Sequence, residues 1–228
     1  MLSFDNAMPV NGQEAAASAG RVQAAPSKTS QPTTTTDGAC ANGQARKHHH
    51  IWLVTGPAGC GKTTVAEYLA KSLDMPYIEG DSHHTPANVE KMRSGNPLTD
   101  ADRWDWLTAL RDESMRRINR GSEGVVVTCS ALKRKYRDVI RVAAYYDHDI
   151  RVHFIFLNAP AEVLLARVTK REGHYMGPSM VQSQFDILER PAEDERDVIS
   201  IDVSRSIEEV KKDVLARVSD ITKAVCRD

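Results

Sequence analysis

The stretch VTGPAGCGKTTVAEYLA, residues 54–70, decides the fold. An apolar run ends in a turn that holds three glycines and a lysine, and a helical pattern follows. Residues 56–63 satisfy the P-loop pattern G-x-x-x-x-G-K-[ST] at every fixed position, in the strand–turn–helix context that it requires. Glycines let successive backbone N–H groups point at phosphate oxygens, and the helix N-terminus adds a partial positive charge. The stretch therefore predicts a loop that binds the phosphates of a nucleoside triphosphate.

Two side chains of this P-loop carry the expected chemistry. Lys62 would reach the β- and γ-phosphates, and the hydroxyl of Thr63 would ligate Mg²⁺. The nucleotide-binding residues expected from the loop are Gly56, Pro57, Ala58, Gly59, Cys60, Gly61, Lys62, Thr63 and Thr64.

The composition limits the classes of protein to which the chain can belong. Its 228 residues are enough for one well-buried domain with length to spare. The net charge is -1, whereas a non-specific nucleic-acid binder usually carries a basic excess, so we expect no nucleic-acid partner. No apolar run approaches the roughly 18 residues needed to cross a membrane. The four cysteines are scattered without a C-x-x-C pair, which favours a reducing, cytoplasmic location.

Residues 1–47 differ in composition from the rest of the chain. They are rich in Ala, Ser, Thr, Gln and Pro and have few large apolar side chains, so they cannot bury enough surface to offset their ordering entropy. A secretory signal would need an apolar core, and a transit peptide would be rich in Arg, whereas this segment has only Arg21 and Arg46. We expect a disordered low-complexity extension, followed by one domain over residues 48–228.

Short apolar runs alternate with helical patterns through this domain. Several runs are β-branched and apolar on both faces, as strands buried in a parallel sheet must be. The alternation predicts an α/β fold, a three-layer α/β/α sandwich with a five-stranded parallel sheet. The expected strands are residues 51–55, 76–79, 124–129, 152–158 and 198–203. The expected helices are residues 62–73, 87–94, 100–120, 132–144, 161–172, 179–189 and 207–225, the third with a capping box at Thr99 and Asp102.

A P-loop alone does not name the acceptor of the phosphoryl group. The chain has no N-K-x-D signature for guanine, and the strand expected at residues 124–129 does not end in the Asp of a Walker-B motif, which weakens the GTPase and ATPase interpretations. The nearest acid at a strand end is Asp81. A carboxylate there could steady the metal through water and accept a proton from a substrate hydroxyl, as suits a small kinase. The alternative is an acid that caps a helix or closes a turn.

Three further segments resemble those of one family, the gluconokinases. Residues 79–107, EGDSHHTPANVEKMRSGNPLTDADRWDWL, are similar to its G-D-x-x-H-x-x-x-N-x-x-K-M-x-x-G-x-P-L-x-D-x-D-R-x-x-W-L segment. Residues 128–141, TCSALKRKYRDVIR, are similar to C-S-A-L-K-x-x-Y-R-D. Residues 167–191 are similar to R-x-G-H-[FY]-M-x-x-x-[LM]-[LV]-x-S-Q-F-x-x-L-E. The resemblance spans about residues 50–222, and this combination is far more specific than the P-loop.

The resemblance implies a P-loop kinase with a nucleoside-monophosphate-kinase-like fold and with ATP and Mg²⁺ as cofactors. It implies phosphorylation of D-gluconate on its 6-hydroxyl to 6-phospho-D-gluconate, which enters the pentose phosphate pathway, and it allows a homodimer. Two alternatives stay open. One is another small kinase, although a shikimate kinase would carry D-x-D where Ser82 and His83 follow Asp81. The other is a nucleotide-binding switch without a small acceptor.

Gluconate carries a carboxylate and a row of hydroxyls, so its site needs a cation and paired donors and acceptors. Arg103 could clamp the carboxylate in a fork, which Lys could not do as well. The alternative is a salt bridge from Arg103 to Asp100 or Asp102. His84 and Asn88 lie one turn apart and suit sugar hydroxyls, unless they only cap the short helix.

Lys133, just after the third expected strand, could bind the substrate or the transferring phosphoryl group. The alternative is a solvated basic face that it shares with Arg134, Lys135 and Arg137. Trp104 and Trp106 are expected to be packing groups.

Residues 170–182 combine cations, glycines and a proline between two expected helices. This composition predicts a mobile lid that closes over the phosphates and excludes water. Arg171 would stabilise charge on the transferring group, and Arg167, one turn earlier, could contact the nucleotide. Either arginine could instead be an exposed helix charge. We expect His174 at the substrate, and Gln184 either at the substrate or holding the lid helix.

Overall fold

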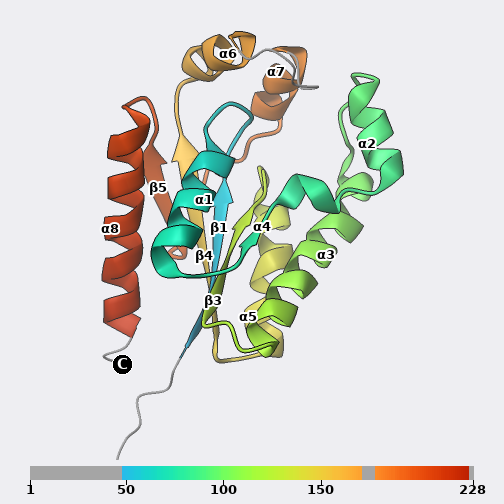
Figure 1. The fold of residues 1–228 in the computed structure, drawn as a ribbon. Coiled ribbons are helices and arrows are strands. Elements are labelled where there is room, and N and C mark those ends of the chain that lie inside the picture. The colour runs from blue at the N-terminus through green and yellow to red at the C-terminus, as the bar shows by residue number, and fades with distance from the viewer. Residues whose placement is uncertain (1–47, 171–177, 226–228) are drawn as a thin grey trace, which may run out of the picture. The chain divides into compact units, whose positions relative to one another are not determined.

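The computed structural model describes residues 48–170 and 178–225 (Figure 1). The described strands and helices lie in one unit that spans residues 43–228. The expected extension, residues 1–47, and much of the expected lid, residues 171–177, lie outside the described residues, so both stay predictions.

Five parallel strands form the central sheet. They are β1 His49–Thr55, β2 Tyr77–Ile78, β3 Gly124–Thr128, β4 Ile150–Asn158 and β5 Val198–Asp202. Their order across the sheet is β2-β3-β1-β4-β5, which confirms the expected parallel sheet. β1 is buried on both faces: Ile51 and Leu53 belong to one apolar cluster, and Trp52 and Val54 belong to the other. This double burial explains the uninterrupted apolar run in the sequence.

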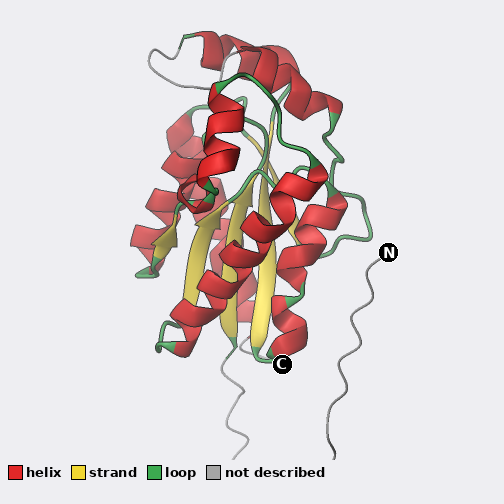
Figure 2. Cartoon of the chain, turned by 90° about the vertical axis from the view of Figure 1, so that its right-hand side faces the viewer, coloured by secondary structure: helices red, strands yellow, loops and turns green. Residues whose placement is uncertain are grey.

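Helices cover both faces of the sheet. The helices of the described residues are α1 Lys62–Leu73, α2 Pro86–Arg93, α3 Asp100–Asn119, α4 Arg134–Arg141, α5 Ala143–Tyr146, α6 Ala161–Thr169, α7 Pro178–Asp186, α8 Ile207–Val225 and the short 3₁₀ helix η1 Gly80–His83. α1 and α8 pack on the face of Trp52, and α3, α4 and α5 pack on the face of Ile51. The three-layer α/β/α sandwich is therefore confirmed (Figure 2). Within residues 48–170 and 178–225, no helix has the length and apolarity to cross a bilayer.

Several elements differ from their expected form. The single helix expected over residues 132–144 is wrong, because α4 and α5 are separate helices. Ala131 has φ 37°, and Lys133 is extended with φ −103° and ψ 150°, so the backbone cannot be helical there. α6 ends at Thr169 rather than at residue 172, and α7 ends at Asp186 rather than at residue 189. β2 is shorter than the expected strand over residues 76–79, and η1 was not expected.

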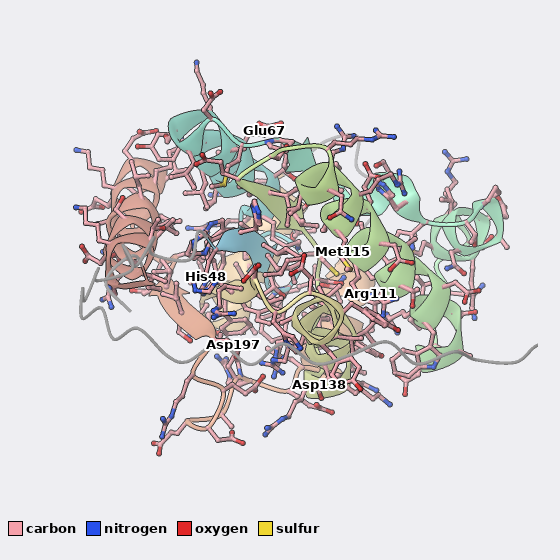
Figure 3. All side chains as sticks on the ribbon, turned by 90° about the horizontal axis from the view of Figure 1, so that it is seen from below. His48, Glu67, Arg111, Met115, Asp138 and Asp197 are labelled. Atoms are coloured by element: carbon pink, nitrogen blue, oxygen red, sulfur yellow. The ribbon has the colours of Figure 1, made fainter. Side chains whose placement is uncertain are left out.

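A buried ion-pair network ties α4 to the segment that leads into β5. The side chains of Arg137 and Glu195 are each 1% exposed and join at 2.6 Å. Arg141 donates to Glu195 and to Asp197 at 2.7 Å, and Asp197 is labelled in Figure 3, which views the molecule from below. Arg137 also donates to the carbonyl oxygen of Ala131 at 3.3 Å and so supports its unusual backbone. The solvated basic face considered for these cations is therefore wrong for Arg137.

The carboxyl ends of β1, β2 and β3 meet at one edge of the sheet, where ligands of such folds bind. The P-loop follows β1, η1 follows β2, and residues 129–133 follow β3. α2, α6 and α7 lie beyond this edge (Figure 1). The topology therefore brings the predicted phosphate loop and the predicted acceptor residues to one place.

Candidate active site

The loop between β1 and α1 has the backbone that its glycines predict. Gly56 and Gly59 have φ 140° and 83°. A Cβ atom at Gly56 would approach the carbonyl oxygen of Leu157 to 2.8 Å, and one at Gly59 would approach a methyl of Val168 to 2.8 Å. Glycine is thus needed for both the turn and the close packing. No acid lies in the first turn of α1, so its N-terminal partial charge is not neutralised there.

Two side chains pair with the backbone of the P-loop. The ammonium of Lys62 donates to the carbonyl oxygens of Gly56 at 3.0 Å and Pro57 at 3.1 Å. From α7, the side-chain oxygen of Gln184 accepts a hydrogen bond from the N–H of Ala58 at 2.7 Å. Gln184 therefore links α7, which begins within the expected lid segment, to the phosphate loop.

A cavity of about 610 Å³ opens between the P-loop, η1, α3 and α7, a size that suits a small ligand. We call it the main cavity. Its wall brings together most of the predicted site residues: Ala58, Gly59, Gly61, Lys62, Thr63, Thr64, Asp81, His84, Arg103, Lys133 and Gln184. A second cavity of about 380 Å³ adjoins the P-loop at Gly59, Cys60 and Gly61.

Glu79, directly after β2, is a site residue that the sequence analysis missed. Its carboxylate accepts hydrogen bonds from the hydroxyls of Thr128 at 2.7 Å and Thr63 at 3.3 Å, and it also bonds to the hydroxyl of Tyr77. Glu79 lines the main cavity together with Asp81. The signal that could have found it is its position at the end of an expected strand, two residues before Asp81.

His84 stacks on Trp106 with the ring centroids 4.1 Å apart. Burial lowers the pKa of His84 below its ordinary value, so the imidazole is neutral near pH 7. Among the described residues, its buried Nδ1 has no hydrogen-bond partner. His84 also lines the main cavity, where a neutral imidazole suits a sugar hydroxyl.

Asp100, the first residue of α3, fixes Lys133 at the cavity wall. The ammonium of Lys133 donates to its carboxylate at 3.1 Å, and Lys135 and Tyr136 donate to the same group. These donors, Lys135 foremost, hold the pKa of Asp100 below its ordinary value. Lys133 is therefore held in place by an ion pair while its side chain lines the main cavity.

Arg103 lies one turn further along α3. Its guanidinium donates to the backbone carbonyl oxygens of Leu98 and Thr99, just before the helix begins. The hydrogen bond to Thr99 measures 3.2 Å. Asp102 pairs instead with Lys91 at 2.6 Å and completes the expected capping box with Thr99. In the described part of the chain, the structure shows no salt bridge from Arg103 to Asp100 or Asp102.

Comparisons with known proteins agree with this geometry. A family model described as an AAA domain matches residues 51–190. A probable gluconokinase of Schizosaccharomyces pombe is 45% identical over 169 residues, which cover 74% of this chain and 87% of that protein. The thermosensitive gluconokinase of Escherichia coli is 38% identical and covers 70% of this chain and 82% of that protein. The chain belongs to the gluconokinase family.

A solved structure supports this assignment. The crystal structure of a gluconokinase from Sinorhizobium meliloti 1021 has a TM-score of 0.67 and 37% identity, and covers 80% of this chain and 97% of that one. The chain is therefore similar to a gluconokinase of known structure in both sequence and fold.

Five described residues of the predicted site lie outside the wall of the main cavity in this gluconokinase-family chain. Three belong to the P-loop, namely Gly56, Pro57 and Cys60, and the others are Asn88 and Arg167. Asn88 donates from its side chain to the carbonyl oxygen of Asp102 at 2.7 Å, and its backbone N–H donates to the hydroxyl of Thr85. These bonds hold α2 against α3. Arg167 donates to the carbonyl oxygen of Val203 at 2.7 Å and lines the second cavity.

Arg171 and His174 lie outside the described residues, so their predicted roles remain predictions. The same holds for the mobility of the expected lid, residues 170–182. The described part of that segment is Lys170 and the start of α7.

Proposed function

We propose that the chain is a gluconokinase, which transfers the γ-phosphoryl group of ATP to the 6-hydroxyl of D-gluconate and yields 6-phospho-D-gluconate and ADP. The observation that carries this proposal is the shared wall of the main cavity. Lys62 and Thr63 of the phosphate loop, the carboxylate of Asp81 and the cations Arg103 and Lys133 face one space of about 610 Å³. A nucleotide-binding switch would need the phosphate loop with Lys62 and Thr63. It would not need the acid and the two cations that face the same space.

The P-loop and the second cavity support the binding of ATP. Lys62 pairs with carbonyl oxygens of its own loop, and a phosphate is a stronger, charge-assisted partner for the ammonium. The second cavity adjoins the same glycines and is lined by Arg167, Lys170 and Arg205. We assign it to the nucleoside end of ATP, which leaves the main cavity to the acceptor.

The donor atoms beside the P-loop fit Mg²⁺. Thr63 Oγ1 and Glu79 Oε2 lie 3.3 Å apart, and Asp81 shares their cavity. Mg²⁺ prefers oxygen ligands and usually binds one or two carboxylates together with waters and phosphate oxygens. When bound, Mg²⁺ neutralises charge on the transferring group.

The acceptor side needs a carboxylate clamp, hydroxyl partners and a base. We assign the carboxylate of gluconate to Arg103 with Lys133 beside it, and a sugar hydroxyl to His84. Asp81 accepts the proton of the 6-hydroxyl as that oxygen attacks the γ-phosphorus. On the family resemblance alone, Arg171 is assigned to the charge on the transferring phosphoryl group.

The test is ADP release by the purified full chain. ATP is held constant while gluconate, shikimate and several nucleoside monophosphates are offered separately, with and without Mg²⁺. The proposal predicts rapid release with gluconate alone, and only when Mg²⁺ is present. Equal rates without gluconate, or with shikimate in its place, would contradict it.

A further inference from the structure

The backbone of Gly80 separates the two acids of the site, Glu79 and Asp81, and is held from both sides. Its N–H donates to the hydroxyl of Thr128 at 3.0 Å, and its carbonyl oxygen accepts from the indole N–H of Trp106 at 2.7 Å. Thr128 belongs to β3 and Trp106 to α3, so two separate elements hydrogen-bond to the backbone of this one residue.

The fit at Gly80 leaves little room for adjustment. A Cβ atom there would lie 1.9 Å from the carbonyl oxygen of Thr128, so this backbone lies directly against β3. The Thr128 hydroxyl also donates to Glu79 at 2.7 Å and thereby orients that carboxylate. On the other side, the ring of Trp106 stacks on His84. The side chains of Thr128 and Trp106 are each only 2% exposed.

We propose that Trp106 and Thr128 are positioning residues of the kinase reaction. They fix the backbone of residues 79–84. Asp81 is thereby positioned to contact the acceptor hydroxyl, and Glu79 is positioned beside Thr63, where Mg²⁺ would bind. The inference rests on the proposed function and goes beyond the packing role that the sequence predicts for Trp106. Packing alone requires an aromatic ring. Positioning the Gly80 backbone requires the indole N–H, because the buried carbonyl oxygen of Gly80 would otherwise be left without a donor, which is costly.

Trp106→Phe tests the hydrogen bond to the carbonyl oxygen of Gly80. The variant keeps an aromatic ring against His84 and removes the donor to Gly80. We expect kcat to fall at least about tenfold, because a displacement of about 1 Å at a reacting group can cost about a hundredfold. The Kd for ATP, measured by direct titration, should stay within about twofold, because the P-loop keeps its own contacts.

Trp52→Phe is the matched control. Trp52 is a fully buried tryptophan of β1 that lines neither cavity, and its indole N–H has no partner among the described residues. It should lose thermal stability without losing kcat. A kcat of Trp106→Phe within twofold of wild type would overturn the proposal, and so would an equal loss of kcat in both variants.

Thr128→Val and Thr128→Ser test the hydrogen bond from the N–H of Gly80. The valine keeps the shape and loses the hydroxyl, so kcat should fall and the Mg²⁺ concentration for half-maximal turnover should rise. The serine keeps the hydroxyl and should restore most of the wild-type kcat. Equal impairment of both variants would show that only packing matters and would overturn the proposal. Failure of the proposed function differs from this result, because the wild type itself would then release no ADP with gluconate.

Discussion

At the scale of single residues, the site separates two acids by one glycine. Glu79 accepts hydrogen bonds from Thr63 and Thr128, whereas Asp81 is exposed in the wall of the main cavity. Their surroundings, rather than their residue types, distinguish them: one carboxylate is aimed at the P-loop hydroxyl, and the other lies beside the space for the acceptor. We therefore assign the role of proton acceptor to Asp81, and we assign Glu79 to the Mg²⁺ site beside Thr63.

Asp81→Asn should separate binding from chemistry. The amide keeps the size of the side chain and removes its charge, so ATP affinity should fall only modestly because the P-loop still holds the phosphates. Turnover at saturating gluconate should fall roughly 10²–10³-fold, or about 3–4 kcal/mol in the barrier, within the usual range for general-base catalysis. If the variant keeps more than about a tenth of wild-type turnover, Asp81 is a turn residue. Lys62→Ala is the contrast, because it should damage ATP binding and turnover together.

Glu79→Gln should behave differently from Asp81→Asn. Loss of the carboxylate beside Thr63 weakens the metal site and leaves the base in place, so turnover should recover as the Mg²⁺ concentration is raised. The measurement is a Mg²⁺ titration of kcat for both variants. Recovery of Asp81→Asn to the same extent would erase the distinction between the two acids.

At the scale of elements, the sheet and most helices could be predicted because their signals are local. The bounds of α1 and α8 are those expected, and the buried strands are apolar on both faces as a parallel sheet requires. The break before α4 could not be predicted. Ala131 is not a glycine, and its left-handed backbone is supported by Arg137, whose partner Glu195 lies far along the chain.

The candidate site could be predicted where a motif fixes the positions of its residues, as in the P-loop. The contacts of Glu79 depend on β3 lying between β2 and β1, an order that no local pattern encodes. The hydrogen bonds that hold Asn88 against α3 likewise join segments whose pairing the sequence does not reveal.

The neighbouring strands β1 and β4 carry a partly buried histidine pair that should make stability depend on pH. His50 Nδ1 and His153 Nε2 lie 3.1 Å apart, and Trp52 stacks on both rings. Burial foremost lowers the pKa of each histidine to about 4. The charges of His48, Arg151 and His49 lower the pKa of His50 further. At His153 the charges of His50 and Arg151 lower the pKa, whereas Asp197 opposes the shift.

The sign of this dependence follows from the proton balance. The unfolded chain takes up these protons as the pH falls below about 6.5, while the folded chain does not until about pH 4, so stability falls over that window. Between pH 7 and pH 5 the two histidines should cost the folded state roughly 3–4 kcal/mol, which lowers the thermal midpoint by about 6–15 °C for a domain of this size. His153→Phe keeps a ring beside Trp52 and should flatten the dependence. A midpoint that is constant, or that rises as the pH falls, would contradict the account.

At the scale of the whole molecule, the residues of the proposed activity all lie in the unit that spans residues 43–228. Every residue that lines the two cavities lies after residue 50, and the family match begins at residue 51. We propose that residues 1–47 contribute nothing to catalysis.

Deletion of residues 1–46 should therefore leave turnover and the thermal midpoint nearly unchanged, because a segment of that composition makes few buried contacts. Both quantities are measured on the truncated and full chains in the same buffer. A drop in the midpoint of more than about 4 °C, roughly 1 kcal/mol, would show that the segment packs on the domain.

The most direct test of the central claim is the proton-coupled ³¹P spectrum of the product made from ATP, Mg²⁺ and D-gluconate by the full chain. The 6-hydroxyl of gluconate is its primary hydroxyl, so a phosphate ester there couples to the two protons of a methylene group and gives a triplet. We predict that triplet, in an amount equal to the ADP formed. A doublet from a secondary hydroxyl, a singlet from the carboxylate, or inorganic phosphate alone would contradict the account.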